Sequence, residues 1–266
     1  MDQEIDPFAE DVMEQYEKSY GKYRKIKDIS VDGDGKTTLK IMIACCHKDK
    51  EKLSEDNAMY YTPIQVGKAL TDICLYDLCD NTGDNISERN YNYSETTALY
   101  WAWKNGFASD AEYIGLRHYR RKFDITDEQL CHLKENGIDI IHVEPVYYDS
   151  IHDSFVSFTK KEKDWELMKL LIKEKFPNYY PTMLAYENQH FICAYNMTIM
   201  RRAIFDEYCE FMFGILTEIE DYYLRIIDRR DRYLGYLAEN LTSIFLMHHK
   251  DDYRKVIAKL IPLVAW

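Results

Sequence analysis

Apolar and polar positions alternate along the chain in a way that predicts strands and helices in turn. A mostly apolar run at 39–45 has the length of a strand and stops at the polar residues 47–50, as a buried strand of a parallel sheet does. Shorter apolar runs at 113–116 and 138–143, each bounded by polar residues, predict two further strands. We expect residues 191–200 to be extended as well.

Other segments repeat apolar residues at helical spacing. The predicted helices lie at 7–21, 66–74, 94–105, 165–176, 204–219 and 233–246. The first is expected to take its N-cap from Asp6 and to carry Pro7 at its first position. The third ends where Asn105 and Gly106 can adopt the left-handed conformation. Strand, helix, helix and strand in succession indicate an α/β sheet.

The chain is expected to form one catalytic domain with attached helices. We predict an accessory helix and turn over 1–38, the main domain over 39–246 and an amphipathic C-terminal tail over 247–266. The apolar residues 256–266 favour a helix packed on the core, and an anchor at a membrane surface is the alternative. No apolar run approaches the ~20 residues that span a bilayer. We therefore expect a cytoplasmic protein, with peripheral contact to the membrane left open.

Composition narrows the classes of partner. The 34 basic and 46 acidic side chains give a net charge of -12, which disfavours binding to nucleic acid. Seven cysteines occur without a CxxC pair, so we expect reduced thiols in the cytosol. The 23 tyrosines suit a carbohydrate surface, because tyrosine offers a ring face and a hydroxyl. This composition alone is not specific for carbohydrate.

The most unusual segment is 115–121, where three arginines and a histidine follow an apolar strand. In parallel α/β sheets, ligands bind outside the carboxyl ends of the strands. The guanidinium groups of Arg117, Arg120 and Arg121, with His118 beside them, have the chemistry to grip a diphosphate. A solvated turn whose arginines pair with surface acids is the alternative, and the spacing alone leaves both open.

A polar loop at 80–85 offers side chains that can bond ribose or sugar hydroxyls, although its spacing alone favours a generic turn. The sequence contains none of the patterns GxGxxG, GxxxxGK, GxSxG or HExxH. This excludes the commonest dinucleotide-binding, kinase, hydrolase and zinc-protease assignments.

Three blocks of the sequence, at 80–87, 95–105 and 113–123, resemble bacterial capsular-polysaccharide glycosyltransferases long catalogued as a domain of unknown function. The resemblance extends to 196–197 and 235–239, and its most specific part is the His-Tyr-Arg-Arg block. It departs from the family at one position, where Asn240 follows Glu239 and the family pattern leads us to expect arginine. The resemblance implies a glycosyltransferase A-type, nucleotide-sugar-binding α/β fold, with a mixed, mainly parallel sheet flanked by helices and extra N- and C-terminal helices.

The resemblance also implies a function. The enzyme would move a hexose, for which galactose in pyranose or furanose form is a candidate, from a uridine-diphosphate sugar to a growing surface polysaccharide or lipid-linked glycan. The residues then expected to bind the donor are Cys46, His47, Lys48, Asp80, Asn81, Asp84, Asn85, Tyr100, Lys104 and Arg117. A nucleotidyltransferase acting on sugar phosphates and a non-catalytic carbohydrate-binding protein remain alternatives.

Catalytic roles follow from the same resemblance. In metal-dependent glycosyltransferases of this fold an Asp-x-Asp element holds a cation against the donor diphosphate, and here His118, Arg120 and Arg121 stand in that place. We therefore expect no metal cofactor, with manganese and magnesium left open. Glu239 is the first candidate for the base that takes the acceptor proton, and a surface glutamate is the alternative. Asp153 and Glu187 are reserve candidates.

Overall fold

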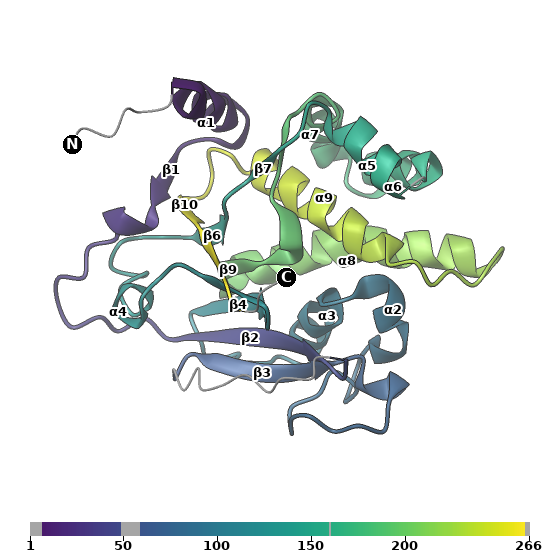
Figure 1. The fold of residues 1–266 in the computed structure, drawn as a ribbon, viewed down its shortest axis with the longest axis horizontal. Coiled ribbons are helices and arrows are strands. Elements are labelled where there is room, and N and C mark those ends of the chain that lie inside the picture. Colours follow the sequence, from purple (N-terminus) through teal and green to yellow (C-terminus); the bar gives the residue numbers. More distant parts are fainter. Residues whose placement is uncertain (1–6, 49–58, 160, 264–266) are drawn as a thin grey trace.

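The computed structural model describes residues 7–48, 59–159 and 161–263. The helices are α1 (Pro7–Tyr20), α2 (Asn90–Tyr93), α3 (Thr96–Lys104), α4 (Asp127–Leu130), α5 (Ile151–Thr159), α6 (Glu162–Lys175), α7 (Tyr180–Tyr186), α8 (Arg202–Leu224) and α9 (Tyr233–His248). The strands are β1 (Tyr23–Lys25), β2 (Leu39–Cys46), β3 (Tyr61–Val66), β4 (Tyr113–His118), β5 (Arg121–Phe123), β6 (Ile140–Val143), β7 (Val146–Tyr147), β8 (Phe191–Ile192), β9 (Thr198–Arg201), β10 (Lys255–Ala258) and β11 (Leu260–Pro262). Figure 1 shows their arrangement.

The described residues form one seven-stranded sheet in the order β1-β10-β6-β9-β4-β2-β3. Every neighbouring pair in it is parallel except the two that involve β9, which runs antiparallel to β4 and to β6. The sheet is therefore mixed and mainly parallel, and helices flank it, as the sequence predicted. Two short antiparallel pairs, β5 with β11 and β7 with β8, lie outside it.

Most of the predicted elements are confirmed. The strand predicted at 39–45 is β2, and the strands predicted at 113–116 and 138–143 are β4 and β6. The predicted helices that begin at 94, 165, 204 and 233 correspond to α3, α6, α8 and α9. The extended prediction for 191–200 holds in part, because a short 3-10 helix, η5 (Ala194–Asn196), separates β8 from β9.

The helix predicted at 66–74 is wrong. Val66, the first residue of the predicted helix, is the last residue of β3, which pairs with β2. Only the short 3-10 helix η2 (Lys68–Leu70) follows. Leu70 and Ile73 are both exposed, so the apolar spacing in this segment does not mark a packed helical face. Gly67 turns the chain with a φ of 65°, a left-handed conformation that ends the strand and that glycine adopts without strain.

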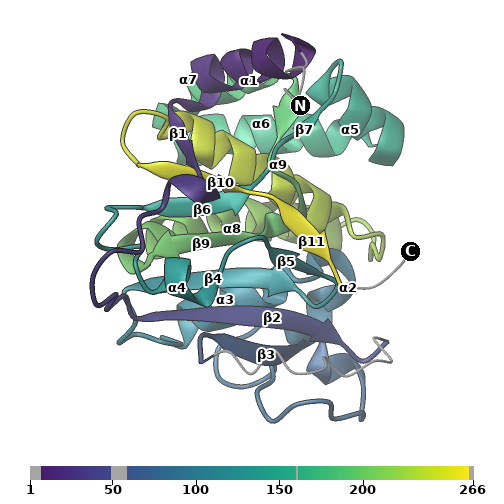
Figure 2. The ribbon, with the colours of Figure 1, turned by 60° about the vertical axis from the view of Figure 1, so that its left-hand side comes forward.

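The C-terminal helix is also a wrong prediction. Residues 255–258 form β10, which lies in the sheet between β1 and β6, and β11 pairs with β5. All four residues of β10 are buried, and strands covered on both faces read as continuous apolar runs without helical or alternating period. Figure 2 shows β11 and β5 in front of the main sheet. The last residues of the predicted tail, 264–266, lie outside the described residues.

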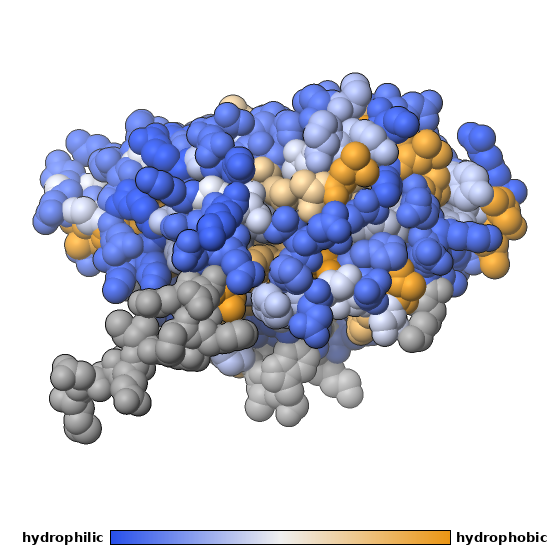
Figure 3. Space-filling model, turned by 90° about the horizontal axis from the view of Figure 1, so that it is seen from above, coloured by the Kyte–Doolittle hydropathy of each residue, from blue (hydrophilic) through white to orange (hydrophobic). Residues whose placement is uncertain are grey.

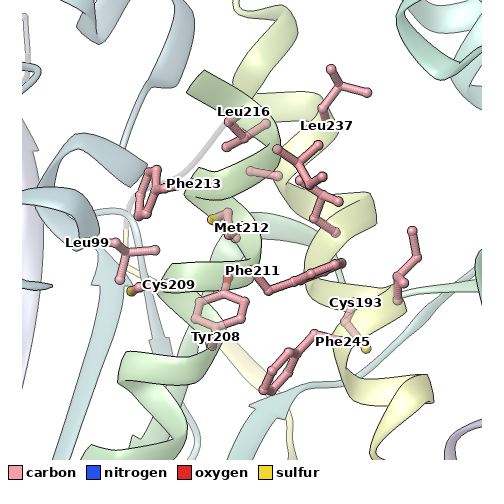
Figure 4. Packing of buried hydrophobic residues seen from close by; sticks show 14 of the residues in the cluster. Leu99, Cys193, Tyr208, Cys209, Phe211, Met212, Phe213, Leu216, Leu237 and Phe245 are labelled. Carbon is pink, nitrogen blue, oxygen red and sulfur yellow. The ribbon is translucent and has the colours of Figure 1, made fainter. Parts of the chain in front are cut away.

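Two hydrophobic cores lie on the two faces of the sheet. The larger one packs α3, α8 and α9 against the sheet, and Figure 4 shows the α8 side chains of this cluster, among them Met212 and Leu216, with Leu99 of α3 and Leu237 of α9. The smaller one joins the other face to α4 and β5, through side chains such as Leu130 and Phe123. Burial on both faces fixes which side chains of each strand point in which direction.

The N-terminal helix belongs to the larger core. The side chains of Tyr16 and Tyr20 on α1 are fully buried, and the Tyr16 hydroxyl lies 3.1 Å from Nε2 of His142 in β6. Pro7 begins the helix, as predicted, whereas the predicted cap Asp6 lies outside the described residues.

The face of the molecule seen in Figure 3 is mostly hydrophilic, and its apolar side chains lie in small separate groups. Among the helices within residues 7–48, 59–159 and 161–263, none has the length and apolar character needed to cross a membrane.

Candidate functional site

The carboxyl ends of three parallel strands meet at one edge of the sheet. In the register, Ala44 of β2 stands beside His118, the last residue of β4, and Cys46 stands beside Val66, the last residue of β3. Cys46, His47 and Lys48, which continue from β2, therefore emerge at the same edge as the His-Tyr-Arg-Arg turn. This is the edge at which α/β sheets bind ligands.

His118 and Glu95 form the first contact of the site. Glu95 immediately precedes α3, and its Oε1 lies 3.5 Å from Nε2 of His118, with both side chains largely buried. The amide of Asn196 donates a 2.8 Å hydrogen bond to the same carboxylate. Burial alone would raise the pKa of Glu95, but the charge of His118 and the bond from Asn196 outweigh it and lower that pKa. Glu95 is therefore ionised at neutral pH.

Glu239 lies on α9 beside this pair. Its Oε1 accepts a 2.8 Å hydrogen bond from the backbone N–H of Tyr195. Burial and the nearby charge of Glu95 raise the pKa of Glu239 from 4.5 to about 7, against the smaller lowering effects of the Tyr195 bond, His118 and Arg232. Two carboxyl groups with different environments thus share one site, and one of them can take up or release a proton near pH 7.

Left-handed backbone conformations gather at this site. Within the described ranges five residues other than glycine have a positive φ, and four of them, Ser94, Tyr195, Asn196 and Arg232, belong to or contact the residues above. Only Ala108 lies elsewhere in the chain. Such conformations cost of order 1–3 kcal/mol each and persist where the surrounding structure holds them, often at functional sites.

The start of α9 fits closely against the turn between α2 and α3. Nε of Arg232 donates a 3.1 Å hydrogen bond to Oγ of Ser94, and a Cβ placed on Gly235 would lie only 3.3 Å from the same oxygen. Asn196 also reaches this contact, because its amide donates to the Gly235 carbonyl at 3.4 Å. Glycine at 235 therefore permits the close approach that brings Glu239 to the site. We call Glu95, His118, Tyr195, Asn196, Arg232 and Glu239 the Glu239 cluster.

The turn formed by residues 118–121, which we call the arginine turn, lies next to the Glu239 cluster. The guanidinium carbon of Arg121 lies 4.4 Å from the ring centroid of Tyr195, and the ring of His118 meets the same ring edge-on at 6.4 Å. Arg120 is exposed, and its guanidinium carbon lies 5.2 Å from the Tyr119 ring. Both arginines thus stand at the carboxyl end of β4.

Arg117 does not share their environment. Its side chain is fully buried and lies on the opposite face of β4 from His118, because successive strand residues alternate. Nη1 donates to the carbonyl oxygens of His118 and Arg121, at 3.2 Å and 3.4 Å. These contacts show Arg117 bracing the turn from within, and its binding of the donor stays a prediction.

Asp80 is likewise a structural residue. It is fully buried, and its carboxylate accepts hydrogen bonds from the backbone N–H groups of Gly67 and Lys68 and from the hydroxyl of Ser87. Its oxygens hold the turn after β3, and the donor-binding role of Asp80 stays a prediction. Exposed Asn81 follows it in the same loop.

The remaining predicted donor residues form a separate group. The hydroxyl of Tyr100 donates to Asp84 at 3.2 Å, Asn85 donates to the carbonyl of Gly83, and Nζ of Lys104 lies 3.6 Å from the centroid of the Trp103 ring. Because α3 rises about 1.5 Å per residue, Lys104 lies roughly 13 Å along the helix from Glu95. The structure does not bring this group together with the Glu239 cluster.

The reserve bases also lie apart from the cluster. Both oxygens of Glu187 contact Nζ of Lys169, and Asp153 is a largely exposed residue of α5 whose charged neighbour is His152. The unexpected Asn240 faces the core, where its amide oxygen accepts a 2.9 Å hydrogen bond from the Tyr186 hydroxyl. An arginine there would need a different packing of α7 and α9.

The sequence analysis missed Glu95, Asn196 and Arg232. Glu95 looked like a favourable charge at the start of a helix, and Asn196 looked like an isolated polar residue in an extended segment. Two signals were available, namely asparagine's tolerance of positive φ and the family resemblance of the blocks 95–105 and 196–197, which contain Glu95 and Asn196. Residues 7–48, 59–159 and 161–263 contain no group of three or more His, Cys, Asp or Glu side chains arranged to hold a metal ion.

Comparisons with known proteins place this geometry in context. A family profile, described as "Domain of unknown function (DUF4422)", matches residues 40–250. No curated protein matches the sequence. Among solved structures, that of the WbbM bifunctional glycosyltransferase aligns with a TM-score of 0.73 and 24 % identity, covering 86 % of this chain and 46 % of its own. This chain thus spans less than half of the WbbM chain, and the likeness shows the fold.

A second solved structure adds nothing to this. The mannosyltransferase Ktr4p from S. cerevisiae aligns over 92 % of this chain and 73 % of its own, but with 13 % identity and a TM-score of only 0.31.

Proposed function

Because this chain belongs to the DUF4422 family and has the glycosyltransferase A-like fold seen in WbbM, we propose that it transfers a hexose from a uridine-diphosphate sugar to a glycan acceptor. The observation that carries the proposal is the Glu239 cluster, in which a half-buried carboxyl with a pKa of about 7 stands beside an arginine turn at the ligand-binding edge of the sheet. Assembly of a surface polysaccharide is the setting that the family resemblance suggests.

The arginine turn is assigned to the donor diphosphate. Arg120 and Arg121 follow the end of β4, and guanidinium groups bind phosphate oxygens in pairs. His118 adds a further hydrogen-bond donor beside them. Charge on the diphosphate grows as the bond to the sugar breaks, so groups fixed at this position stabilise the transition state. We propose that these side chains do the work for which related enzymes use a cation.

Glu239 is assigned to the acceptor. The acceptor hydroxyl attacks C1 of the donor sugar, its proton passes to the Glu239 carboxylate, and a new bond forms between the acceptor oxygen and C1. The bond between C1 and the phosphate oxygen breaks, and its electron pair leaves with uridine diphosphate. A base with a pKa near the working pH suits this step, because at that pH a substantial fraction of it is ionised and the carboxylate is still basic enough to take the proton. Glu95 stays ionised and keeps the pKa of Glu239 raised.

The test compares Glu239→Gln with the wild-type protein. We expect the variant to bind uridine diphosphate normally in a calorimetric titration. The rate of hexose transfer from a panel of uridine-diphosphate hexoses to acceptor sugars should fall about 10²-fold or more. Asp153→Asn removes a carboxylate from an exposed position and serves as the matched control. Unchanged turnover in Glu239→Gln would reject its role as the base.

Failure of the wild-type protein to bind any nucleoside diphosphate would reject the proposed function altogether. Binding of sugar phosphates with nucleotide transfer, or of carbohydrate without any turnover, would identify the two alternative functions.

A further inference from the structure

The apolar face of α5 continues beyond the core. Ile151 and Phe155 are 2 % and 7 % exposed, whereas Phe158, seven residues after Ile151 and thus on the same face, is 71 % exposed. The Phe158 ring meets the edge of the Tyr236 ring at 5.1 Å with an interplanar angle of 90°. An aromatic contact therefore places Phe158, although solvent covers most of its surface.

Tyr236 connects this exposed ring to the Glu239 cluster. It lies three residues before Glu239 and four after Arg232 on the first turns of α9, so the three side chains share one face of the helix. The guanidinium carbon of Arg232 lies 5.7 Å from the Tyr236 ring centroid. A line of aromatic surface thus runs from the reacting carboxyl toward α5, with a cation beside it.

We propose that Phe158 and Tyr236 form the surface on which the hexose rings of the glycan acceptor stack. The inference rests on the proposed function and assigns its acceptor side. A hexose presents C–H groups on its faces and hydroxyls at its rim, and so needs aromatic faces with polar groups next to them. Here the polar groups are Arg232, Glu239 and the Tyr236 hydroxyl. An acyl chain or an apolar protein partner would not need them.

The test measures carbohydrate binding directly. The probes are methyl glycosides of disaccharides and trisaccharides built from galactose, glucose or mannose. They are titrated in the presence of uridine diphosphate, and binding is followed by saturation-transfer NMR. We expect Phe158→Ala to weaken binding of the tightest probe about fivefold, and Phe158→Trp, which keeps a ring, to restore it. Tyr236→Leu, which keeps apolar bulk without a ring, should weaken binding similarly. Tyr222→Ala removes an exposed aromatic ring from α8 and is the control.

Nucleotide release from the donor in the absence of acceptor is measured on the wild type and tests the proposed function separately, and Tyr222→Ala should leave it unchanged. Equal probe affinity in Phe158→Ala and wild type, or no binding of any probe to the wild type, would overturn the inference while donor turnover upheld the proposed function. Ring-dependent probe binding without turnover of any donor would uphold the binding surface and reject the proposed function.

Discussion

Replacing Glu239 by glutamine should stabilise the protein at alkaline pH while it removes activity. Burial and the Glu95 charge hold the pKa of Glu239 at about 7, against an ordinary value of 4.5. Below pH 4.5 the carboxyl is protonated in both the folded and the unfolded chain, and no penalty arises. As pH rises through 7, the folded chain must ionise a buried group that the unfolded chain ionises freely, so stability is lost.

The size of the effect follows from the two pKa values. At about 1.4 kcal/mol per pH unit, the penalty reaches roughly 3 kcal/mol once Glu239 is fully ionised in the folded chain. Between pH 5 and pH 8 it grows by about 2.5 kcal/mol. Glutamine has nearly the same shape and no charge, so Glu239→Gln should gain this amount over wild type across that range. In a chain of this length the gain corresponds to a rise in the unfolding midpoint of roughly 5 °C.

Thermal unfolding of both proteins at pH 5 and pH 8 provides the measurement. Comparing the difference between the proteins at the two pH values cancels the contributions of the other titrating groups. Asp153→Asn, at an exposed position, checks that loss of a carboxylate by itself has no such effect. If wild type and Glu239→Gln kept the same difference at both pH values, the raised pKa would be refuted, and with it the physical reason for Glu239 to act as a base near neutrality.

Three further results are expected. Glu95→Gln removes a charge that raises the pKa of Glu239, so the rise of kcat/KM with pH, centred near 7 in the wild type, should move down by about one pH unit; an unmoved profile would contradict the coupling. Arg120→Lys should weaken uridine-diphosphate binding roughly tenfold by calorimetry, because lysine keeps the charge but loses the planar fork, whereas Arg230→Lys, at an exposed surface pair, should not. Transfer by the wild type should survive exhaustive chelation, and complete loss restored by manganese or magnesium would show that the arginine turn does not replace a cation.

Long helices and the central strands could be predicted because their apolar residues repeat over many positions. The stripe that became α8 is an example, since its apolar face is buried along most of its length. The strand β10 could not be told from a helix, because a short run buried on both faces carries no period. The segment after Val66 failed for the opposite reason, since its apolar spacing arose by chance in an exposed turn.

The candidate site could be predicted only in part. The rule that ligands bind at the carboxyl ends of parallel strands identified the turn after His118, and the structure places Glu239 beside it. The proximity of Glu239 to Tyr195, Glu95 and Arg232 depends on backbone turns that bring distant segments together, and the hydrophobic pattern does not signal it. The burial of Asp80 could not be predicted, because a buried carboxylate that holds a turn and an exposed one that binds sugar look the same in sequence.

The position of β10 in the sheet bears on how the protein is made. Within the main sheet β1 has one neighbour, and Tyr23 of β1 pairs with Lys255 of β10. A ribosome releases the early strand long before its partner has been translated, so this edge stays open for most of synthesis. The parallel strands β2, β3 and β4 pair with one another much earlier. The side of the sheet formed by β2, β3 and β4 can therefore assemble during translation. On the other side, β1 gains its neighbour only after translation has passed the end of β10.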